Sequence, residues 1–288
     1  MFATARHLLV TLSVVLAGFW INVAGTSAAE ASAPLTLGIH PYLPTQELNT
    51  RFRPLADYLG KTLGRTIDIR IGRDYEEHIR AVGANTVDIA FMGPAQYVTL
   101  VNEYGPRPLL ARLEVNGKPE LFGAIVVRKD SSIRTLADLK GHRFAFGDPD
   151  STMSHIVPQG MMAEAGVPLS ALSEYKFLGA HKNVALGVLS GDFDAGAVKM
   201  EILDEYADRG LRMLIKTPAV SEHLLLVRPD MPADQVEKLR QALLNLKNLP
   251  EGAQIMQSIH KGMTAFAPAV DADYDSLRTL MRALEPGK

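Results

Sequence analysis

Short apolar runs alternate with amphipathic segments along most of the chain. Apolar residues that alternate or run together over about 4–8 positions predict β-strands, whereas apolar residues spaced three and four apart predict helices. The expected strands are residues 35–39, 66–71, 87–92, 109–115, 122–128, 144–146, 175–178, 195–198, 211–216 and 224–228. The expected helices are 52–63, one opening at 74–75, 95–103, 136–139, one from 151–152 to near 166, 181–189, 233–246, 250–258 and 274–284. This order of strands and helices predicts an α/β fold.

One tight turn stands between two of these strands. Asn116-Gly117-Lys118 separates residues 109–115 from residues 122–128. Asn-Gly flanked by apolar residues is a strong signal for two antiparallel strands joined by a hairpin. We therefore expect these two strands to pair with each other.

The chain contains one internal echo. Residues 75–92 and residues 181–198 each run from a helix to an apolar strand that follows an aspartate. The echo predicts two similar lobes with the same β-α-β order. In open α/β sheets the ligand binds beyond the carboxyl ends of the strands. A cleft between two such lobes would be formed by residues that open helices, which are Tyr75, Ser151, Thr152 and His181.

The stretch 144–158 carries the clearest candidate chemistry. A short strand and the turn 147–150 lead to Ser151 and Thr152, where a helix should begin. Free backbone N–H groups and the helix dipole make such a position suitable for an anion. No Lys or Arg lies between Arg143 and Lys176, so we expect neutral donors to hold the anion. The alternative is an ordinary helix cap, and Pro158 should kink that helix or mark where it becomes regular.

The amino-terminal residues 1–29 have the pattern of a secretory signal peptide. Arg6 and His7 precede a mostly apolar stretch, residues 8–23, and small residues end at Ala29. We expect cleavage near Ala29 and a periplasmic protein. An uncleaved membrane anchor is the alternative, although the apolar stretch is short for a spanning helix and contains Asn22.

Composition narrows the classes of function. The chain has 288 residues, 47% of them hydrophobic, which is enough for two cores. It has no cysteine, which excludes disulfides, thiolate metal sites, a cysteine nucleophile and a lipid-bearing cysteine. Loss of Arg6 with the signal peptide changes the net charge from −2 to −3. This charge gives no support to binding of nucleic acid or of an anionic membrane.

Several segments, in this order, resemble a known family, the phosphate/phosphite/phosphonate-binding (PhnD-like) proteins that serve ABC transporters. The segments are PLADYL at 54–59, DY at 74–75, VDIAFMGP at 87–94, GDPDST at 147–152, VP at 157–158, GAH at 179–181 and GDFDA at 191–195. The resemblance runs from residue 35 to residue 284. It implies a two-lobed type II periplasmic binding protein fold with a ligand cleft between the lobes. The implied lobes are 34–123 plus 225–288 and 124–224, with the hinge near 123–127 and 224–228, and closure around the ligand is the expected motion.

The resemblance also implies ligand contacts. Tyr75 corresponds to a phenol donor, Ser151 and Thr152 to hydroxyl donors at the helix start, and His181 to a further donor. Where the family has a third hydroxyl this chain has Met153, with Ser154 as a substitute if the helix start shifts.

Other positions of the implied site differ more from the family. Leu121 stands in place of an aromatic donor, and Glu201 and His223 stand where two carboxylates hold an amine in aminophosphonate binders. Loss of two donors would leave a more apolar pocket, because a buried acceptor without a donor costs ~1–3 kcal/mol. The ligand is then an anion with an apolar portion, or a different oxyanion.

Further residues are weighed against simpler interpretations. Tyr42 follows the first strand and fits the strand-end rule. A protonated His181 would make binding sensitive to pH near neutrality. His155 is more simply a packed residue, and Lys182 is more simply exposed to solvent.

We expect a monomeric solute-binding protein without cofactor, metal or catalysis, which captures a small anion and presents it to an ABC permease. One alternative is a ligand sensor that docks on a histidine kinase. Another is an enzyme on the same fold, similar to pyrimidine-precursor synthases, although no base is fixed beside Ser151 in the sequence.

Overall fold

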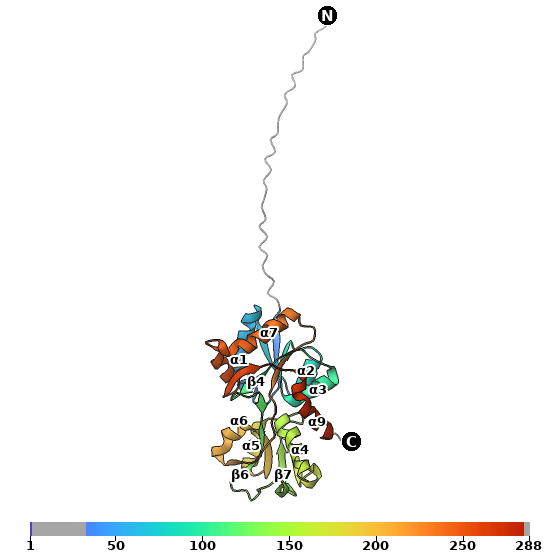
Figure 1. Cartoon of the computed structure of the whole chain (residues 1–288), viewed down its shortest axis with the longest axis vertical. Coiled ribbons are helices and arrows are strands. Elements are labelled where there is room, and N and C mark those ends of the chain that lie inside the picture. The colour runs from blue at the N-terminus through green and yellow to red at the C-terminus, as the bar shows by residue number, and fades with distance from the viewer. Residues whose placement is uncertain (2–32, 285–288) are drawn as a thin grey trace. The chain divides into compact units, whose positions relative to one another are not determined.

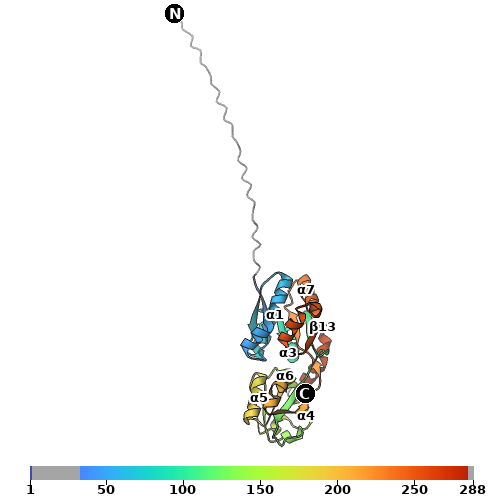
Figure 2. The same cartoon turned by 90° about the vertical axis from the view of Figure 1, so that its left-hand side faces the viewer.

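The computed structural model describes Met1 and residues 33–284. Residues 33–284 form two lobes, each built on a β-sheet with helices against it, as Figures 1 and 2 show from two sides. This confirms the α/β class. Residues 2–29 of the expected signal peptide lie outside the described residues. Within residues 33–284 no helix is long and apolar enough to cross a bilayer.

The first lobe contains a six-stranded sheet. Its strands, in spatial order, are β13 (Met263–Ala267), β4 (Leu109–Val115), β12 (Leu224–Val227), β3 (Ile89–Met92), β1 (Leu35–Ile39) and β2 (Ile67–Ile71). The strands β1, β2 and β3 are parallel, whereas β12 and β13 run antiparallel to their neighbours. Its helices are α1 (Thr45–Leu63), α2 (Tyr75–Gly83), α3 (Pro94–Tyr104), α7 (Ala233–Asn245) and α8 (Gly252–Ile259).

The second lobe contains a five-stranded sheet. Its strands, in spatial order, are β10 (Leu211–Lys216), β6 (Gly123–Arg128), β9 (Ala195–Lys199), β7 (Arg143–Phe146) and β8 (Glu174–Phe177). Its helices are α4 (Val157–Glu164), α5 (His181–Ser190) and α6 (Met200–Tyr206). A π-helical turn at Thr152–Ile156 precedes α4, so the helix becomes regular next to Pro158, as the sequence predicted.

The chain crosses between the lobes twice through a short antiparallel pair, β5 (Glu120–Leu121) with β11 (Val220–Ser221). The expected hinge residues 123–127 and 224–228 lie just beyond these crossings, in β6 and in β12 with the residue after it, and the hinge stays a prediction. The last helix, α9 (Asp275–Leu284), contacts α3 of the first lobe and α4 of the second (Figure 1). A Cβ on Gly160 would come within 2.7 Å of Leu280, which shows how closely α9 approaches α4.

The internal echo of the sequence corresponds to a structural unit that occurs once in each lobe. β1-α1-β2-α2-β3 in the first lobe and β7-α4-β8-α5-β9 in the second give the same local order, with the third strand of each unit beside the first. The residues that directly follow the carboxyl ends of β1, β3, β7 and β9 are His40, Gly93, Gly147 and Met200.

Three expectations about elements were wrong or incomplete. Strands β4 and β6 do not form a hairpin, because the turn returns only for the single bridge between Val115 and Lys118 before the chain leaves for the other lobe. The strand β13 and the helix α6 were not expected. Helix α1 begins at Thr45 rather than at residue 52, and its polar first turns carry Glu47 and Arg51, an i,i+4 ion pair.

Candidate functional site

Two helix starts of the second lobe meet at Ser151 and His181. The hydroxyl of Ser151 caps the π-helical turn by accepting from the N–H of Ser154 at 3.2 Å, and it lies 3.4 Å from Nε2 of His181. Nδ1 of His181 accepts from the backbone N–H of Lys199 at 3.2 Å. Nδ1 therefore carries no proton in the neutral ring, and Nε2 is the donor.

The imidazole of His181 is neutral at neutral pH. Burial, and after it the charge of Lys199, lowers the pKa of His181 to about 3. The pH-sensitive binding expected from a protonated His181 is therefore not supported. The ring can donate one N–H to an oxygen atom but does not supply a positive charge.

Thr152 connects the two lobes. Its hydroxyl oxygen accepts from the N–H of Ala95 at 3.0 Å, at the start of α3 in the first lobe. The N–H of Gly93 is satisfied by the side-chain oxygen of Gln96 at 2.8 Å. The side-chain nitrogen of Gln96 is buried and has no hydrogen-bond partner within the described part of the chain.

Tyr75 comes to the same place from the first lobe. Asp74 caps α2 by accepting from the N–H of Glu77 at 2.7 Å, which fixes the position of Tyr75 at the first turn. The ring of Tyr75 stands edge-on to His40, with centroids 5.1 Å apart. Burial, and then the charge of Asp148, raises the pKa of Tyr75 well above its usual value, so its hydroxyl remains a donor. We refer to Tyr75, Ser151, Thr152 and His181 as the polar cluster.

Ser154 does not take the place of the missing third hydroxyl. Its hydroxyl donates to the carbonyl of Ala197 on β9, and the residue is fully buried. Met153 turns toward the crossing strands, where its sulfur lies 3.4 Å from the hydroxyl of Thr217. Neither residue is among those that border the cavity described next, and His155 packs against Phe177, with centroids 4.8 Å apart.

A cavity of about 940 Å³ lies beside the polar cluster. Residues from both lobes border it, and two of the predicted site residues, Tyr42 and Glu201, are among them. Leu121 also borders it, as expected from the resemblance, together with Phe122, which lies under Lys216 at 3.6 Å. The polar cluster itself is closed over by its own contacts and does not border this cavity.

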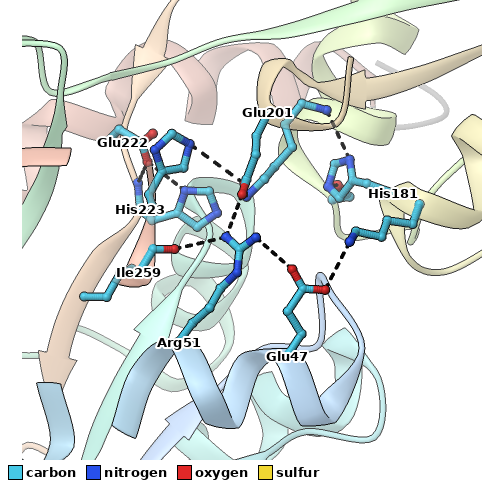
Figure 3. A network of polar contacts seen from close by, with 11 residues as sticks. Glu47, Arg51, His181, Glu201, Glu222, His223 and Ile259 are labelled. Atoms are coloured by element: carbon cyan, nitrogen blue, oxygen red, sulfur yellow. Dashed lines mark hydrogen bonds and ion pairs between the residues drawn. The ribbon is translucent and has the colours of Figure 1, made fainter. Parts of the chain in front are cut away.

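Glu201 is the centre of an ion-pair network that joins the lobes (Figure 3). Its Oε1 accepts from Arg51 of α1 at 2.6 Å, and its Oε2 lies 3.5 Å from Lys199 and 3.8 Å from His260. Burial would raise the pKa of Glu201, but these positive groups outweigh it and lower the pKa to about 2. Sequence reasoning named Glu201 but not Arg51, because no local pattern links residues that are 150 positions apart.

A second interlobe ion pair lies at the edge of this network. Lys182 of α5 pairs with Glu47 of α1 at 3.1 Å and with Glu205 of α6 at 3.2 Å. The sequence suggested solvent exposure for Lys182. The structure instead places its ammonium between two carboxylates from different lobes.

Sequence reasoning missed two further groups of the site. Glu222 borders the cavity and holds His223, whose Nδ1 lies 2.7 Å from Oε2 of Glu222. His223 stacks on Phe91, with centroids 5.3 Å apart. The other group is Lys199, which is buried beside the polar cluster and brings a positive charge into a site for which we expected neutral donors.

The described residues contain no group of three or more metal-ligating side chains that could hold an ion. What remains is a set of hydrogen-bond donors from two lobes, one lysine and a large adjoining cavity. This arrangement offers donors that can hold the oxygen atoms of an anion.

Comparisons with known proteins identify the family of this chain. The profile of the family described as "ABC transporter, phosphonate, periplasmic substrate-binding protein" matches residues 37–274. The chain belongs to this family. It is 26% identical over 277 residues to the phosphate-import protein PhnD of Mycolicibacterium smegmatis, with 88% of this chain and 86% of that protein covered. It is 25% identical over 264 residues to the phosphonates-binding periplasmic protein of Escherichia coli, with 88% and 77% covered.

The fold of this family member matches solved relatives. PhnD1 from Prochlorococcus marinus in complex with methylphosphonate superposes with a TM-score of 0.80 at 22% identity, covering 87% of this chain and 97% of that one. The type II periplasmic binding protein fold expected from the resemblance is therefore confirmed. As a member of the family, the chain is a substrate-binding protein of the ABC transporter class, and the family implies a periplasmic location.

Proposed function

We propose that this protein captures a phosphonate- or phosphate-type anion that carries an organic group, and that it delivers the anion to an ABC permease. The contacts within the polar cluster open when the ligand enters, so that its donors face the phosphoryl oxygens, and the organic group occupies the nearby cavity. The observation that carries this proposal is that Lys199, whose backbone N–H bonds His181 of the polar cluster, also borders the cavity of about 940 Å³.

The size of the cavity supports an organic group. Pockets for drug-sized ligands have volumes of ~300–1,000 Å³. A cavity of about 940 Å³ is at the upper end of that range, far beyond what the few heavy atoms of phosphate need. Its border is partly apolar, with Leu113, Leu121 and Ile259, which suits carbon rather than a second anion.

A direct test is isothermal titration of the mature protein with phosphate, methylphosphonate, phenylphosphonate and a sugar phosphate, with ethanesulfonate as the sulfur counterpart. We expect the phosphorus ligands with organic groups to bind most tightly. Ser151→Ala should weaken them ~10–100-fold, since a hydrogen bond to a charged group contributes ~1.5–3 kcal/mol.

Ser190→Ala is the matched control, because the Ser190 hydroxyl bonds only within its own helix end, to Gly187 and Asp192, and is exposed. No binding of any phosphorus compound by the wild-type protein would refute the proposal.

We further propose that the protein catalyses no reaction. A serine beside a histidine suggests a nucleophile and its base, but Nδ1 of His181 already accepts from Lys199. Nε2 then carries the proton and cannot take one from Ser151. A burst of product from an activated ester, lost in Ser151→Ala, would contradict this.

The remaining parts of the proposal concern processing and partners. We propose cleavage near Ala29, a monomer in solution and a permease as the partner, with a histidine-kinase receptor as the alternative partner. Mass spectrometry of the exported protein tests the first point and light scattering the second. Ligand-dependent binding to permease-containing membranes, compared with kinase-containing membranes, decides between the two partners.

A further inference from the structure

Lys199 holds an unusual place in the site. It is the last residue of β9, only 6% exposed, and its backbone N–H fixes His181 of the polar cluster. Its side chain leaves the cluster and borders the cavity. The ammonium lies 3.9 Å above the ring centre of Tyr42 and 3.5 Å from Oε2 of Glu201.

One carboxylate, that of Glu201, and one aromatic face contact this ammonium, and Glu222 borders the same cavity. Burial lowers the pKa of Lys199, and the charges of Glu201 and Glu222 act against that effect. A positive group over an aromatic ring and beside carboxylates is the arrangement by which proteins bind ammonium ions. Here the chain supplies the ammonium itself.

We propose that Lys199 is a specificity-determining residue, whose ammonium occupies the position that a ligand amino group would take against Glu201 and the ring of Tyr42. The protein therefore selects phosphorus anions whose organic group carries no amino group. This inference rests on the proposed function and names the class of ligand within it.

The network around Glu201 strengthens the argument. Oε1 of Glu201 is already bound by Arg51 at 2.6 Å, and Lys199 faces Oε2. A ligand ammonium would enter beside two resident positive charges and would have to displace Lys199 to reach a carboxylate. Oε2 is buried beside Lys199 and His260, so a ligand group reaches it only after Lys199 has moved.

The experiment compares two ligands that differ by one amino group, ethylphosphonate and 2-aminoethylphosphonate. We expect the wild-type protein to bind ethylphosphonate at least as tightly as the amine. In Lys199→Met the ratio of the two affinities should shift at least tenfold toward the amine, because the carboxylates lose their resident positive charge. The double variant Lys199→Met/Glu201→Gln should lose most of that shift.

Lys216→Met is the matched control, because Lys216 also borders the cavity but stacks on Phe122. Its affinity ratio should stay within twofold of the wild type. Thermal unfolding of each variant without ligand checks that the variant folds. The ratio of the two affinities in the wild-type protein tests the inference independently of any variant.

Three results would overturn the inference while leaving the proposed function intact. They are a wild-type preference for the amine of tenfold or more, an unchanged ratio in folded Lys199→Met, and loss of both ligands in that variant, which would make Lys199 a direct anion ligand. If the wild-type protein binds neither these two compounds nor any other phosphorus anion, the proposed function itself fails.

Discussion

Replacing Arg51 with methionine should open the lobes and weaken ligand binding. Arg51 makes three contacts: to Glu201 at 2.6 Å, to the carbonyl of Ile259 at 3.1 Å and to Glu47 at 2.8 Å. Only the contact with Glu201 joins the two lobes, because Glu47 and Ile259 belong to the same lobe as Arg51. When the lobes separate, that contact alone is lost. The substitution removes the contacts with Glu47 and Ile259 from both forms, so the loss of the contact with Glu201 should destabilise the closed form relative to the open form.

The magnitude follows from the exposure of the pair. Breaking a fully buried ion pair costs ~3–5 kcal/mol, whereas an exposed pair contributes ~0–1 kcal/mol. The side chains of Arg51 and Glu201 are 20% and 15% exposed, and Glu201 keeps Lys199 nearby. We therefore expect a loss of ~1–2 kcal/mol from the closed form, which corresponds to ~5–30-fold weaker binding of a ligand that requires closure.

Two measurements check this. Titration calorimetry with the best phosphorus ligand gives the affinity, and small-angle X-ray scattering gives the radius of gyration with and without ligand. Arg53→Met is the control, because Arg53 lies on the same helix and bonds only within the first lobe, to Asp57 and the carbonyl of Ile67. An affinity of Arg51→Met within twofold of the wild type, with the same radius of gyration, would refute the reasoning.

Two further predictions concern stability. Thr152→Val leaves the buried N–H of Ala95 without an acceptor, and we expect a loss of ~1–3 kcal/mol in denaturant unfolding; no loss would contradict the interlobe bond. Thermal stability without ligand should fall as the pH drops from 7 to 4.5. His181 and His78 each have a folded pKa of about 3 against 6.5 when unfolded, so the unfolded chain takes up more protons in this range. Burial raises the pKa of Asp150 from 3.8 to about 6, so between these pH values its protonation stabilises the folded state as the pH falls and opposes the effect of the histidines. A melting temperature that stays constant or rises from pH 7 to pH 4.5 would show that the histidines do not dominate.

The sequence predicts most of the fold because local patterns dominate it. Asp74 capping α2, the regular start of α4 at Pro158 and the repeated β-α-β order all follow from periodicity and turn chemistry. The hairpin error has the opposite cause. Asn116-Gly117 does make a tight turn, with positive φ at both residues, but the partners of β4 are β12 and β13, more than 100 residues later. A turn signal cannot specify pairing at that distance.

The residues of the candidate site also differ in whether a local pattern predicts them. Ser151 and His181 were predicted because both open helices at strand ends, and the structure brings them within 3.4 Å. Lys199 closes an apolar strand and Arg51 lies in a polar helical turn, so neither position carries a local signal for a site. Lys199 contacts Glu201 within the second lobe, whereas Arg51 contacts Glu201 only across the interface between the two lobes.

The place of β12 in the first sheet has a consequence for how the chain is made. β12 lies between β3 and β4, whereas all five strands of the second sheet are complete at Lys216. As the chain is synthesised from its amino terminus, the second sheet can therefore form before the first sheet is complete. The first sheet, although its first strands are made earlier, still lacks Leu224–Val227 at that point. A chain truncated between these points would carry one finished sheet and one with open edges, which are sites for aggregation. Only a chain that includes β12 and β13 can therefore complete both sheets.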